Sequence, residues 1–357
     1  MDYDKLEAEE QWPELVAALA AVPDAELDAP TLLRRGRVGW RCGRYEQSLA
    51  DFQAAAARFP MADTHVALAK ALISLDRFDE ATAQIQAART AAPEHFEALF
   101  LAGVDRFRRA STDSALRELT RAVRRHPGWA PSRIALWQVA QVAGRPDAAS
   151  TRMPDFPQDP FERSHLEAMQ WFGPAGRWVA YAPEVLAHAV DAIDAGDLIV
   201  ECGVFHGRSI RCMAARSSLP IHGFDSFEGL PEDWGDYPAG SYSTDGIIPD
   251  VPEHVTLHRG WFENTLPGFA EAHAGRQLAL LHVDCDLYSS TVTILESLAP
   301  MISDGTILVF DDLLGYPNYR EDEFRALQEY LARTGQNWEP IAAALVGREA
   351  AIRIRRP

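Results

Sequence analysis

The sequence predicts an α/β fold, with a mostly parallel sheet that ends in an antiparallel hairpin, preceded by an all-α repeat domain. Three observations lead to this prediction. Small and apolar residues recur every 33 to 34 positions in the first half of the chain. Strand and helix patterns alternate in the second half, and the last residues have the pattern of a hairpin. We therefore expect a helical repeat domain at 1–152, a linker at 153–160 and an α/β domain at 161–357.

The net charge of -18 is concentrated in the second half of the 357 residues. Residues 1–156 hold 20 Lys and Arg against 22 Asp and Glu, a balance of -2, whereas residues 157–357 hold 14 against 30, a balance of -16. Nucleic acids and anionic membranes bind basic surfaces, so we expect neither as a partner. A cationic cofactor and a metal ion are compatible with this charge.

The chain shows no sign of export. No apolar run approaches the ~18 residues of a membrane span, and the first residues are acidic where a signal peptide is basic and then apolar. The four cysteines have no C-x-x-C spacing, which favours reduced, packed thiols over a zinc site or disulfides. We therefore expect a cytoplasmic protein.

The repeat is clearest over residues 43–60. The small, large apolar, small and proline positions of this segment are Ser48, Phe52, Ala55 and Pro60, then Ala81, Ile85, Ala88 and Pro93, then Ala115, Leu119, Ala122 and Pro127. Small residues let paired helices approach, the larger residue fills the groove, and proline ends the second helix. The period resembles tetratricopeptide repeats over residues 31–150, with Asp76 in place of a glycine and a partial unit at 144–149 as cap.

Arrays of this kind commonly present a concave surface to a peptide or another subunit. The sequence leaves open whether this array binds a peptide or protein partner, or only supports the catalytic half or a dimer. A homo-oligomer is our expectation. Residues Met153–Pro160 hold three prolines in eight positions, which is typical of a linker.

The second half alternates between strands and helices. We expect a helix over 183–193, strands at 198–202, 220–224, 255–258, 278–283 and 306–310, helices from Arg208, Glu263, Thr291 and Glu321, and a hairpin formed by 341–346 and 350–354. Such alternation builds a mostly parallel sheet with helices on both faces and ligands at the carboxyl ends of the strands. The final antiparallel hairpin is typical of the class I methyltransferase fold and unusual for a dinucleotide-binding domain.

The first strand runs into a glycine-containing turn at Gly203 and Gly207, followed by a helix. Such a junction directs backbone N–H groups and a helix N-terminus at a ligand. A dinucleotide site has G-x-G-x-x-G, but Glu201 occupies the first glycine position here. A carboxylate repels pyrophosphate and accepts from an ammonium group, which favours the aminoacyl end of S-adenosylmethionine. The alternative is an ordinary glycine-rich turn.

The next two strand ends add residues suited to an adenosine. Asp225 lies 22 residues beyond Gly203, where an acid accepts both ribose hydroxyls; helix capping is the alternative. Trp261 and Phe262 follow the third strand and could wall the adenine or belong to the core. The predicted cofactor-binding set is Glu201, Gly203, Val204, Gly207, Ser209, Asp225, Ser226, Trp261, Phe262 and Asp284.

Four carboxylates follow the fourth and fifth strands: Asp284, Asp286, Asp311 and Asp312. These strands should be neighbours ~4.8 Å apart, so the carboxylates would converge and repel one another unless a hard divalent cation, Mg²⁺ above all, joined them. At least one is expected to cap a following helix. His282 lies inside an apolar strand and is expected to be a core histidine rather than a catalytic one.

Residues 198–332 resemble the macrocin and mycinamicin O-methyltransferase family. The matching strings are Glu201–Val204, Gly223–Pro231, Gly260–Pro267 and Asp284–Ser290. The resemblance implies S-adenosylmethionine-dependent methylation of a hydroxyl on a sugar or other secondary metabolite, usually with Mg²⁺. It implies Asp284, Asp311 and Asp312 as metal ligands, with Asp284 and Asp286 in the catalytic set and Asp286 as general base.

The segment 233–251 would form a lid over this small-molecule acceptor, with Trp234, Tyr237 and Tyr242 as contacts. The repeat array departs from the characterised sugar methyltransferases, so the acceptor stays open. A second hypothesis is a metal-independent methyltransferase acting on a nitrogen or carboxylate of a peptide or carrier held by the repeats. A third is a non-catalytic adaptor with this fold, and a nicotinamide-dependent oxidoreductase is disfavoured by Glu201.

Overall fold

The computed structural model describes residues 3–8, 11–23, 26–174 and 176–356. The chain forms two compact units, Met1–Val139 and Ala140–Pro357. We call them the repeat domain and the α/β domain. The segment expected to be a linker therefore belongs to the α/β domain, where Met153 is 2% exposed and Pro160 begins a helix.

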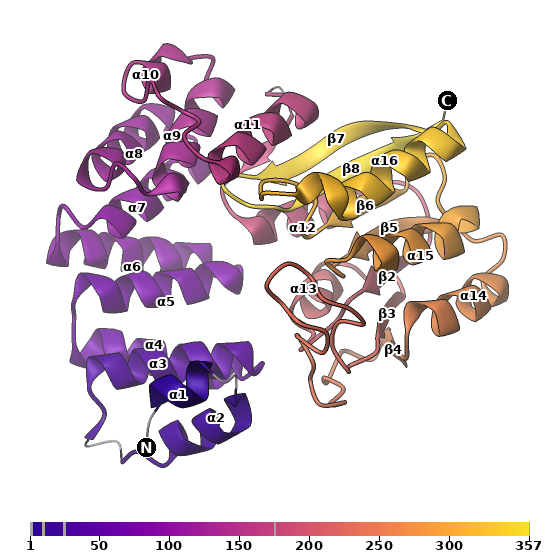
Figure 1. The fold of residues 1–357 in the computed structure, drawn as a ribbon, viewed down its shortest axis with the longest axis horizontal. Coiled ribbons are helices and arrows are strands. Elements are labelled where there is room, and N and C mark those ends of the chain that lie inside the picture. Colours follow the sequence, from indigo (N-terminus) through magenta and orange to yellow (C-terminus); the bar gives the residue numbers. More distant parts are fainter. Residues whose placement is uncertain (1–2, 9–10, 24–25, 175, 357) are drawn as a thin grey trace. The chain divides into compact units, whose positions relative to one another are not determined.

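The repeat domain consists of paired helices (Figure 1). Its described helices are α1 (Tyr3–Ala8), α2 (Trp12–Ala20), α3 (Ala29–Arg41), α4 (Tyr45–Arg58), α5 (Ala62–Ser74), α6 (Phe78–Ala91), α7 (Phe96–Arg108), α8 (Thr112–Arg125) and α9 (Ala130–Val142), which reaches into the second unit. The prolines of the repeat follow α4, α6 and α8, as the period predicts.

Close helix packing explains why the repeat needs small residues. A Cβ on Gly36 would lie 2.7 Å from the ring of Phe52, and one on Gly103 would lie 2.5 Å from Leu119. Phe52 and Leu119 are the large apolar residues that the period placed in the groove between paired helices. The tetratricopeptide-like architecture is thus confirmed at the level of side-chain packing.

The α/β domain has one eight-stranded sheet. Its elements are α10 (Asp147–Ser150), α11 (Pro160–Phe172), β1 (Trp178–Val179), α12 (Ala182–Asp191), β2 (Leu198–Cys202), α13 (Arg208–Arg216), β3 (Ile221–Asp225), β4 (Val255–Arg259), α14 (Phe262–Ala272), β5 (Leu278–Val283), α15 (Tyr288–Leu298), β6 (Ile307–Phe310), α16 (Glu323–Thr334), β7 (Asn337–Ala344) and β8 (Ala350–Arg355). Short 3₁₀ turns occupy Ala299–Met301 and Tyr319–Glu321.

The strand order is β1-β7-β8-β6-β5-β2-β3-β4, and every pairing is parallel except those of β8 with β6 and β7. This confirms the mostly parallel sheet with a C-terminal antiparallel hairpin. Helices α14, α15 and α16 pack together on one face, while α12 and α13 pack together on the other (Figure 1).

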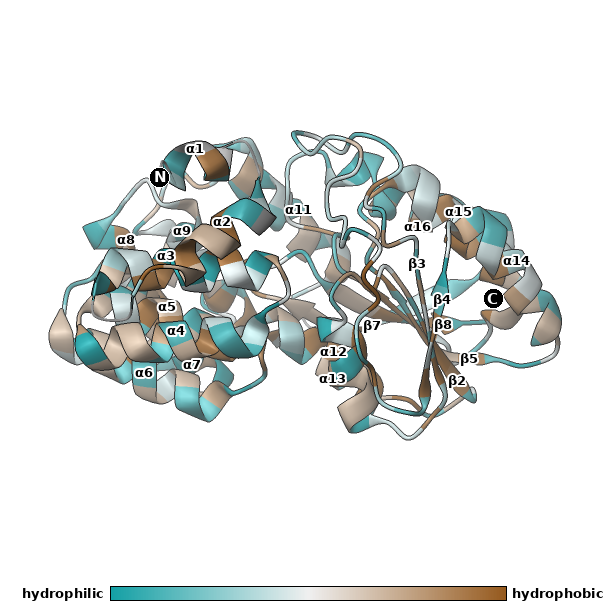
Figure 2. Ribbon diagram, turned by 90° about the horizontal axis from the view of Figure 1, so that it is seen from below, coloured by the Kyte–Doolittle hydropathy of each residue, from teal (hydrophilic) through white to brown (hydrophobic). Residues whose placement is uncertain are grey.

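The strands form the hydrophobic centre of the α/β domain, as Figure 2 shows. Every residue of β2 and β5 is buried, including one Glu and one His. Because the sheet is parallel through its middle, β2, β3, β4, β5 and β6 all end at the same edge. Among the described residues, no helix combines the length and apolarity needed to span a membrane.

Candidate active site

A cleft of about 570 Å³ lies where β2, β3, β4, β5 and β6 end. Eleven predicted residues line it: Gly203, Asp225, Ser226, Trp234, Tyr242, Trp261, Phe262, Asp284, Asp286, Asp311 and Asp312. Five predicted residues do not line it: Glu201, Val204, Gly207, Ser209 and Tyr237. The volume is typical of a site for a cofactor and a small molecule.

The turn after β2 requires glycine at position 203. Gly203 has φ +95°, and a Cβ there would fall 1.7 Å from the carbonyl oxygen of Asp284. The turn therefore touches the loop after β5, and both loops border the cleft. Gly207, with φ +74°, is the residue immediately before α13, so the strand, turn and helix junction forms as the sequence predicts.

Asp225 holds the turn in place. One carboxylate oxygen accepts from the backbone N–H groups of Val204 and Phe205, at 2.8 and 2.7 Å, and the other accepts from Phe227 N at 2.6 Å. Asp225 was expected to accept from a ribose, and it lines the cleft as that role requires. In the structure its three hydrogen bonds tie the loops after β2 and β3 together. Ser226 is likewise engaged, accepting from Glu228 N at 3.1 Å.

Trp261 and Phe262 end one strand and begin the next helix. Trp261 is the residue immediately before α14, and Phe262 is its first residue. Both are partly exposed, and both line the cleft. Of the two expectations for this pair, the geometry therefore favours a wall of the cleft over the hydrophobic core.

Glu201 does not face the cleft. Its side chain is fully buried, and Oε1 lies 2.8 Å from Nδ1 of His282. The structure thus offers Glu201 no direct contact with a molecule in the cleft, because the strand turns its carboxylate toward the neighbouring strand β5. In this structure Glu201 contacts His282, and its contact with an ammonium group stays a prediction.

The four aspartates converge as predicted. β5 and β6 pair in parallel, with Val283 opposite Phe310, so the residues that follow each strand meet. Burial, followed by the charge of Asp311, raises the pKa of Asp284 well above its usual range. Burial, followed by the charge of Asp312, raises the pKa of Asp286 to about 9. Asp284 and Asp286 thus resist ionisation beside their neighbours.

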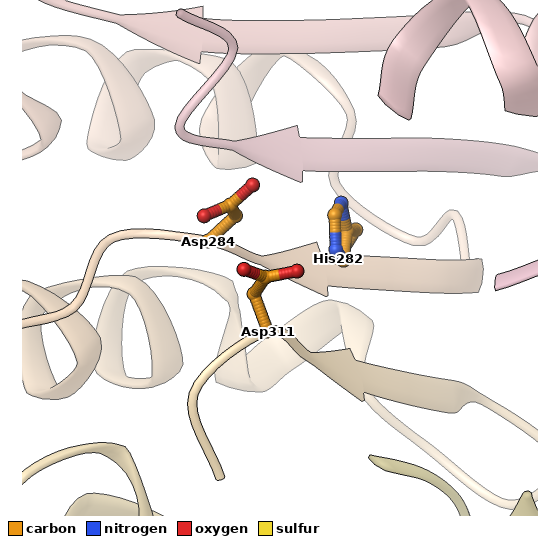
Figure 3. A group of neighbouring side chains, drawn as sticks. All are labelled: His282, Asp284 and Asp311. Atoms are coloured by element: carbon orange, nitrogen blue, oxygen red, sulfur yellow. The ribbon is translucent and has the colours of Figure 1, made fainter. Parts of the chain in front are cut away.

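A histidine joins two of these aspartates in a group of possible cation ligands. One ligand atom each from His282, Asp284 and Asp311 lies within 4.8 Å of the other two (Figure 3). Asp312 is not part of this group. Its Oδ1 accepts from Arg348 at 2.7 Å, and burial followed by the charge of Asp311 raises its pKa, while Arg348 opposes that shift. The group in this structure thus includes His282 and not Asp312, and Asp312 as a metal ligand stays a prediction.

Three charged residues that border the aspartates were not predicted. Glu323 begins α16, is fully buried, and accepts from Asp312 N at 3.1 Å; burial followed by Asp312 raises its pKa well above the usual range. Arg348 and Glu349 line the cleft, and burial followed by Asp311 raises the pKa of Glu349 to about 8. The sequence could have indicated Arg348 and Glu349, because they lie in the turn of the predicted hairpin. Since β8 pairs antiparallel with β6, that turn lies at the edge of the sheet where β6 ends.

Aromatic side chains of the lid segment, residues 233–251, contact one another. Trp234 and Tyr237 stack with ring centroids 5.6 Å apart, and Tyr242 lies 5.5 Å from Tyr237. Asp322 anchors the segment, accepting from Trp234 Nε1 at 3.3 Å and from the hydroxyl of Tyr316 at 2.9 Å. Trp234 and Tyr242 therefore border the cleft, whereas Tyr237 supports them from outside.

The donor set suits a divalent cation. Two carboxylates and an imidazole converge, and the pKa of Asp284 is raised by burial and by neighbouring carboxylates, which is the situation that a bound cation relieves. The surroundings also suit an adenosyl cofactor, because Gly203 has no side chain to separate its backbone from the cleft, and the aromatic Trp261 and Phe262 line the same cleft.

Residues 200–313 match the model of a methyltransferase domain. The 8-demethyl-8-(2,3-dimethoxy-alpha-L-rhamnosyl)-tetracenomycin-C 4'-O-methyltransferase of Streptomyces olivaceus is 35% identical over 168 residues, which cover 39% of this chain and 59% of that enzyme. Demethyldecarbamoylnovobiocin O-methyltransferase of Streptomyces niveus is 31% identical over 160 residues, which cover 37% of this chain and 58% of the relative. The chain thus spans less than two thirds of either curated relative.

A crystal structure of a calicheamicin methyltransferase aligns at 21% identity with a TM-score of 0.38, covering 63% of this chain and 91% of that one. The sequence matches place a methyltransferase domain inside the α/β domain and relate it to natural-product O-methyltransferases. The residues that match the methyltransferase model, 200–313, include the turn after β2, the acidic cluster and the lid segment. The closer kinship with macrocin and mycinamicin enzymes stays a prediction.

Proposed function

We propose that the α/β domain transfers a methyl group from S-adenosylmethionine to a hydroxyl of a sugar or another natural-product intermediate, with a divalent cation, Mg²⁺ above all. One observation carries the proposal. The glycine turn after β2 and the acidic cluster after β5 and β6 open into the same cleft, within residues that match a methyltransferase domain. Both curated relatives are named as O-methyltransferases of natural products.

The chain's own residues divide into two groups around this cleft. The backbone of the Gly203 turn, with Trp261 and Phe262, would hold the methyl donor. Trp234 and Tyr242 would hold the acceptor, since aromatic faces stack on the apolar face of a sugar or on a planar ring. Holding the acceptor oxygen in line with the methyl group contributes most of the acceleration, about 7–11 kcal/mol for well-oriented reactants.

Asp286 is the proposed general base, and Asp284 and Asp311 would hold the cation, with Asp312 as the further ligand that the resemblance implies. When bound, the cation supplies positive charge that lowers the pKa of the acceptor hydroxyl. Asp286 would accept the hydroxyl proton as the new O–CH₃ bond forms and the S–CH₃ bond of the sulfonium breaks, with its electron pair left on the sulfur of S-adenosylhomocysteine. Burial, followed by the charge of Asp312, raises the pKa of Asp286 to about 9 without a cation. The positive charge of a bound cation would favour the ionised form of Asp286, which is the form that can accept the proton.

Methyl transfer with a labelled donor tests this function. Full-length protein is incubated with isotopically labelled S-adenosylmethionine, Mg²⁺ and a panel of rhamnosides and phenolic glycosides, and the products are identified by mass spectrometry. We expect label on one acceptor oxygen and loss of transfer in EDTA. Transfer to nitrogen or to a carboxylate, unaffected by EDTA, would favour the metal-independent hypothesis instead.

The repeat domain has a cavity of its own, of about 610 Å³. Most of its lining residues belong to α3 and α5, and the lining includes Trp12, Leu33, Arg37, Trp40, Arg41, Val66 and Lys70. Its three acidic residues are already engaged: Glu7 with Arg34, Asp63 with His95, and Glu97 with Lys70. Neither Arg37 nor Arg41 has a carboxylate partner within the described part of the chain, and Arg41 lies over the ring of Trp12. The cavity thus offers two guanidinium groups beside aromatic rings.

For this groove we propose an acidic peptide segment of another protein as the partner, because arginine pairs with carboxylates and the tryptophans offer apolar contact. Selection of random displayed octapeptides on the full-length protein tests the proposal. Enriched peptides should be rich in Asp or Glu beside apolar residues and should be lost on Arg37→Glu/Arg41→Glu. Enrichment that is independent of charge would contradict it. That the protein is a homo-oligomer and cytoplasmic also stays a prediction.

A further inference from the structure

Glu201 and His282 form a buried pair beneath the acidic cluster. They are opposite each other in the parallel pairing of β2 and β5, with Glu201 fully buried and His282 3% exposed. Glu201 Oε1 and His282 Nδ1 are 2.8 Å apart. A histidine in such a strand was expected to be a packing residue, but here its neighbours are polar on both sides: Glu201 on one, and Asp284 and Asp311 on the other.

The pairing with Glu201 decides which ring nitrogen is free. At 2.8 Å from Glu201 Oε1, Nδ1 is placed to donate to that carboxylate, in the tautomer that leaves the lone pair of Nε2 free. Within the described residues, Nε2 has no hydrogen-bond partner. Figure 3 shows the ring with one nitrogen turned toward Asp311, in the group whose ligand atoms lie within 4.8 Å of one another.

The second oxygen of Glu201 provides an independent observation. Glu201 Oε2 is buried and has no hydrogen-bond partner. Burying a carboxylate oxygen without a hydrogen-bond partner destabilises the folded state, because the oxygen loses its hydration and gains no replacement contact. An imidazole that donates through Nδ1 while its other nitrogen binds a cation is polarised toward that carboxylate, which is the arrangement found around metal-binding histidines.

We infer that His282 is a nitrogen ligand of the cation bound by Asp284 and Asp311, and that Glu201 is the residue that positions it. This inference rests on the metal dependence in the proposed function. It has a consequence for the choice of metal. Mg²⁺ prefers oxygen donors, whereas imidazole favours first-row transition ions, so the site should bind Mn²⁺ and more so Co²⁺ in preference to Mg²⁺.

The test uses full-length protein and the metal ions alone. Mn²⁺-loaded protein, with and without ¹⁵N-labelled histidine, is examined by pulsed electron paramagnetic resonance for coupling to one histidine nitrogen. Calorimetry measures the dissociation constants of Co²⁺ and Mg²⁺ for the parent, His282→Asn, Glu201→Gln and the control His222→Asn. His222 lies on β3, partly buried in the same sheet and absent from the residues that line the cleft.

We expect nitrogen coupling in the parent, and Co²⁺ binding weakened about 10- to 100-fold in both His282→Asn and Glu201→Gln. Mg²⁺ binding should change less, and His222→Asn should match the parent. Absence of nitrogen coupling in the parent would overturn the inference, even where the variants fail to fold. Equal Co²⁺ affinity in folded His282→Asn would also overturn it.

Failure of the proposed function gives a different result. Nitrogen coupling without any methyl transfer would support His282 as a ligand and reject the methyltransferase assignment. Methyl transfer that EDTA abolishes, with no nitrogen coupling, would support the function and reject His282. The two readouts share neither substrate nor cofactor, so they separate the two conclusions.

Discussion

The two domains treat their carboxylates in opposite ways. In the repeat domain, Glu94 accepts from Arg125 at 2.6 Å and also pairs with Arg121, and these hydrogen bonds lower its pKa to about 2. In the α/β domain, burial and neighbouring carboxylates raise the pKa of Asp286 to about 9. The repeat domain thus pairs Glu94 with arginines of a following helix, whereas the α/β domain gathers acids at one sheet edge.

Acids that are paired with arginine stabilise the fold, whereas acids that are clustered together are available for function. An acid paired with arginine is stabilised in its ionised form and contributes to the folded state. Acids that raise one another's pKa destabilise the empty site, and a fold retains such a cluster where a ligand or a reaction depends on it. The domain with the clustered acids is also the one that matches a methyltransferase domain.

Removing the proposed base is the largest test of this comparison. Asp286→Asn keeps the shape of the side chain but cannot accept the hydroxyl proton, so turnover should fall about 10²- to 10⁴-fold. Cation affinity, measured by calorimetry, should stay close to that of the parent because Asp284 and Asp311 remain. Full turnover in Asp286→Asn would mean that the raised pKa of this residue has no part in the chemistry.

A backbone test asks whether the cleft is built on the Gly203 turn. The Cβ of Gly203→Ala would meet the carbonyl oxygen of Asp284 at 1.7 Å, at a φ of +95°, so one of the two loops must move. We expect a loss of about 2–4 kcal/mol in the free energy of unfolding and much weaker cofactor binding. Chemical denaturation and calorimetry measure the two effects.

Gly268→Ala is the matched control for that substitution. Gly268 lies in α14, and a Cβ there would have no neighbour within 4 Å. The free energy of unfolding should stay the same or rise by about 0.4–1 kcal/mol. A similar loss in both variants would show that the close approach of the two loops does not matter for stability.

A melting experiment compares the cation-free and cation-loaded α/β domain within the full chain. The folded-state pKa of Asp286 lies above its unfolded value of 3.8, so the folded state binds the extra proton. The stability that this proton contributes is fully present below pH 3.8 and is lost as pH rises through about 9. In EDTA, the α/β transition should therefore move to lower temperature between pH 5 and 9.

Added cation should oppose this fall in melting temperature, because its positive charge neutralises the carboxylates that have lost their protons. At a hundredfold excess over its dissociation constant, a bound ion stabilises by about 2.7 kcal/mol, and its affinity should rise with pH over the same interval. Differential scanning calorimetry with and without Mg²⁺ or Mn²⁺ measures the shift. A melting temperature that changes with neither pH nor cation would contradict the conclusion that the clustered carboxylates destabilise the cation-free site.

The sequence alone predicted much of the fold and part of the site. Alternating patterns placed the strands within a few residues, and the Gly203 turn and Asp284 and Asp311 fell where expected, because local pattern and strand ends determine them. The Glu201–His282 contact depends on the register between β2 and β5, which no local pattern reveals. The part played by Glu323 and Arg348 depends on how α16 and the hairpin return to the sheet edge.

The smallest expected effect belongs to the repeat domain, where Glu94→Gln removes one paired acid. The folded-state pKa of Glu94 is lowered from 4.5 to about 2, so the stability that this group contributes is present above pH 4.5 and is lost as pH falls through about 2. The effect should be slight because Glu94 is solvent-exposed and water screens its ion pairs. In thermal melts at pH 2, 3, 4.5 and 7, the parent's repeat transition should move to lower temperature on acidification, and that of Glu94→Gln should move less.

The direction of this pH response is opposite to that of the cation-free α/β domain, which gains stability as its clustered acids take up protons. Parallel pH responses in the two transitions would mean that both domains use their acids in the same way, and the contrast between paired and clustered carboxylates would fail.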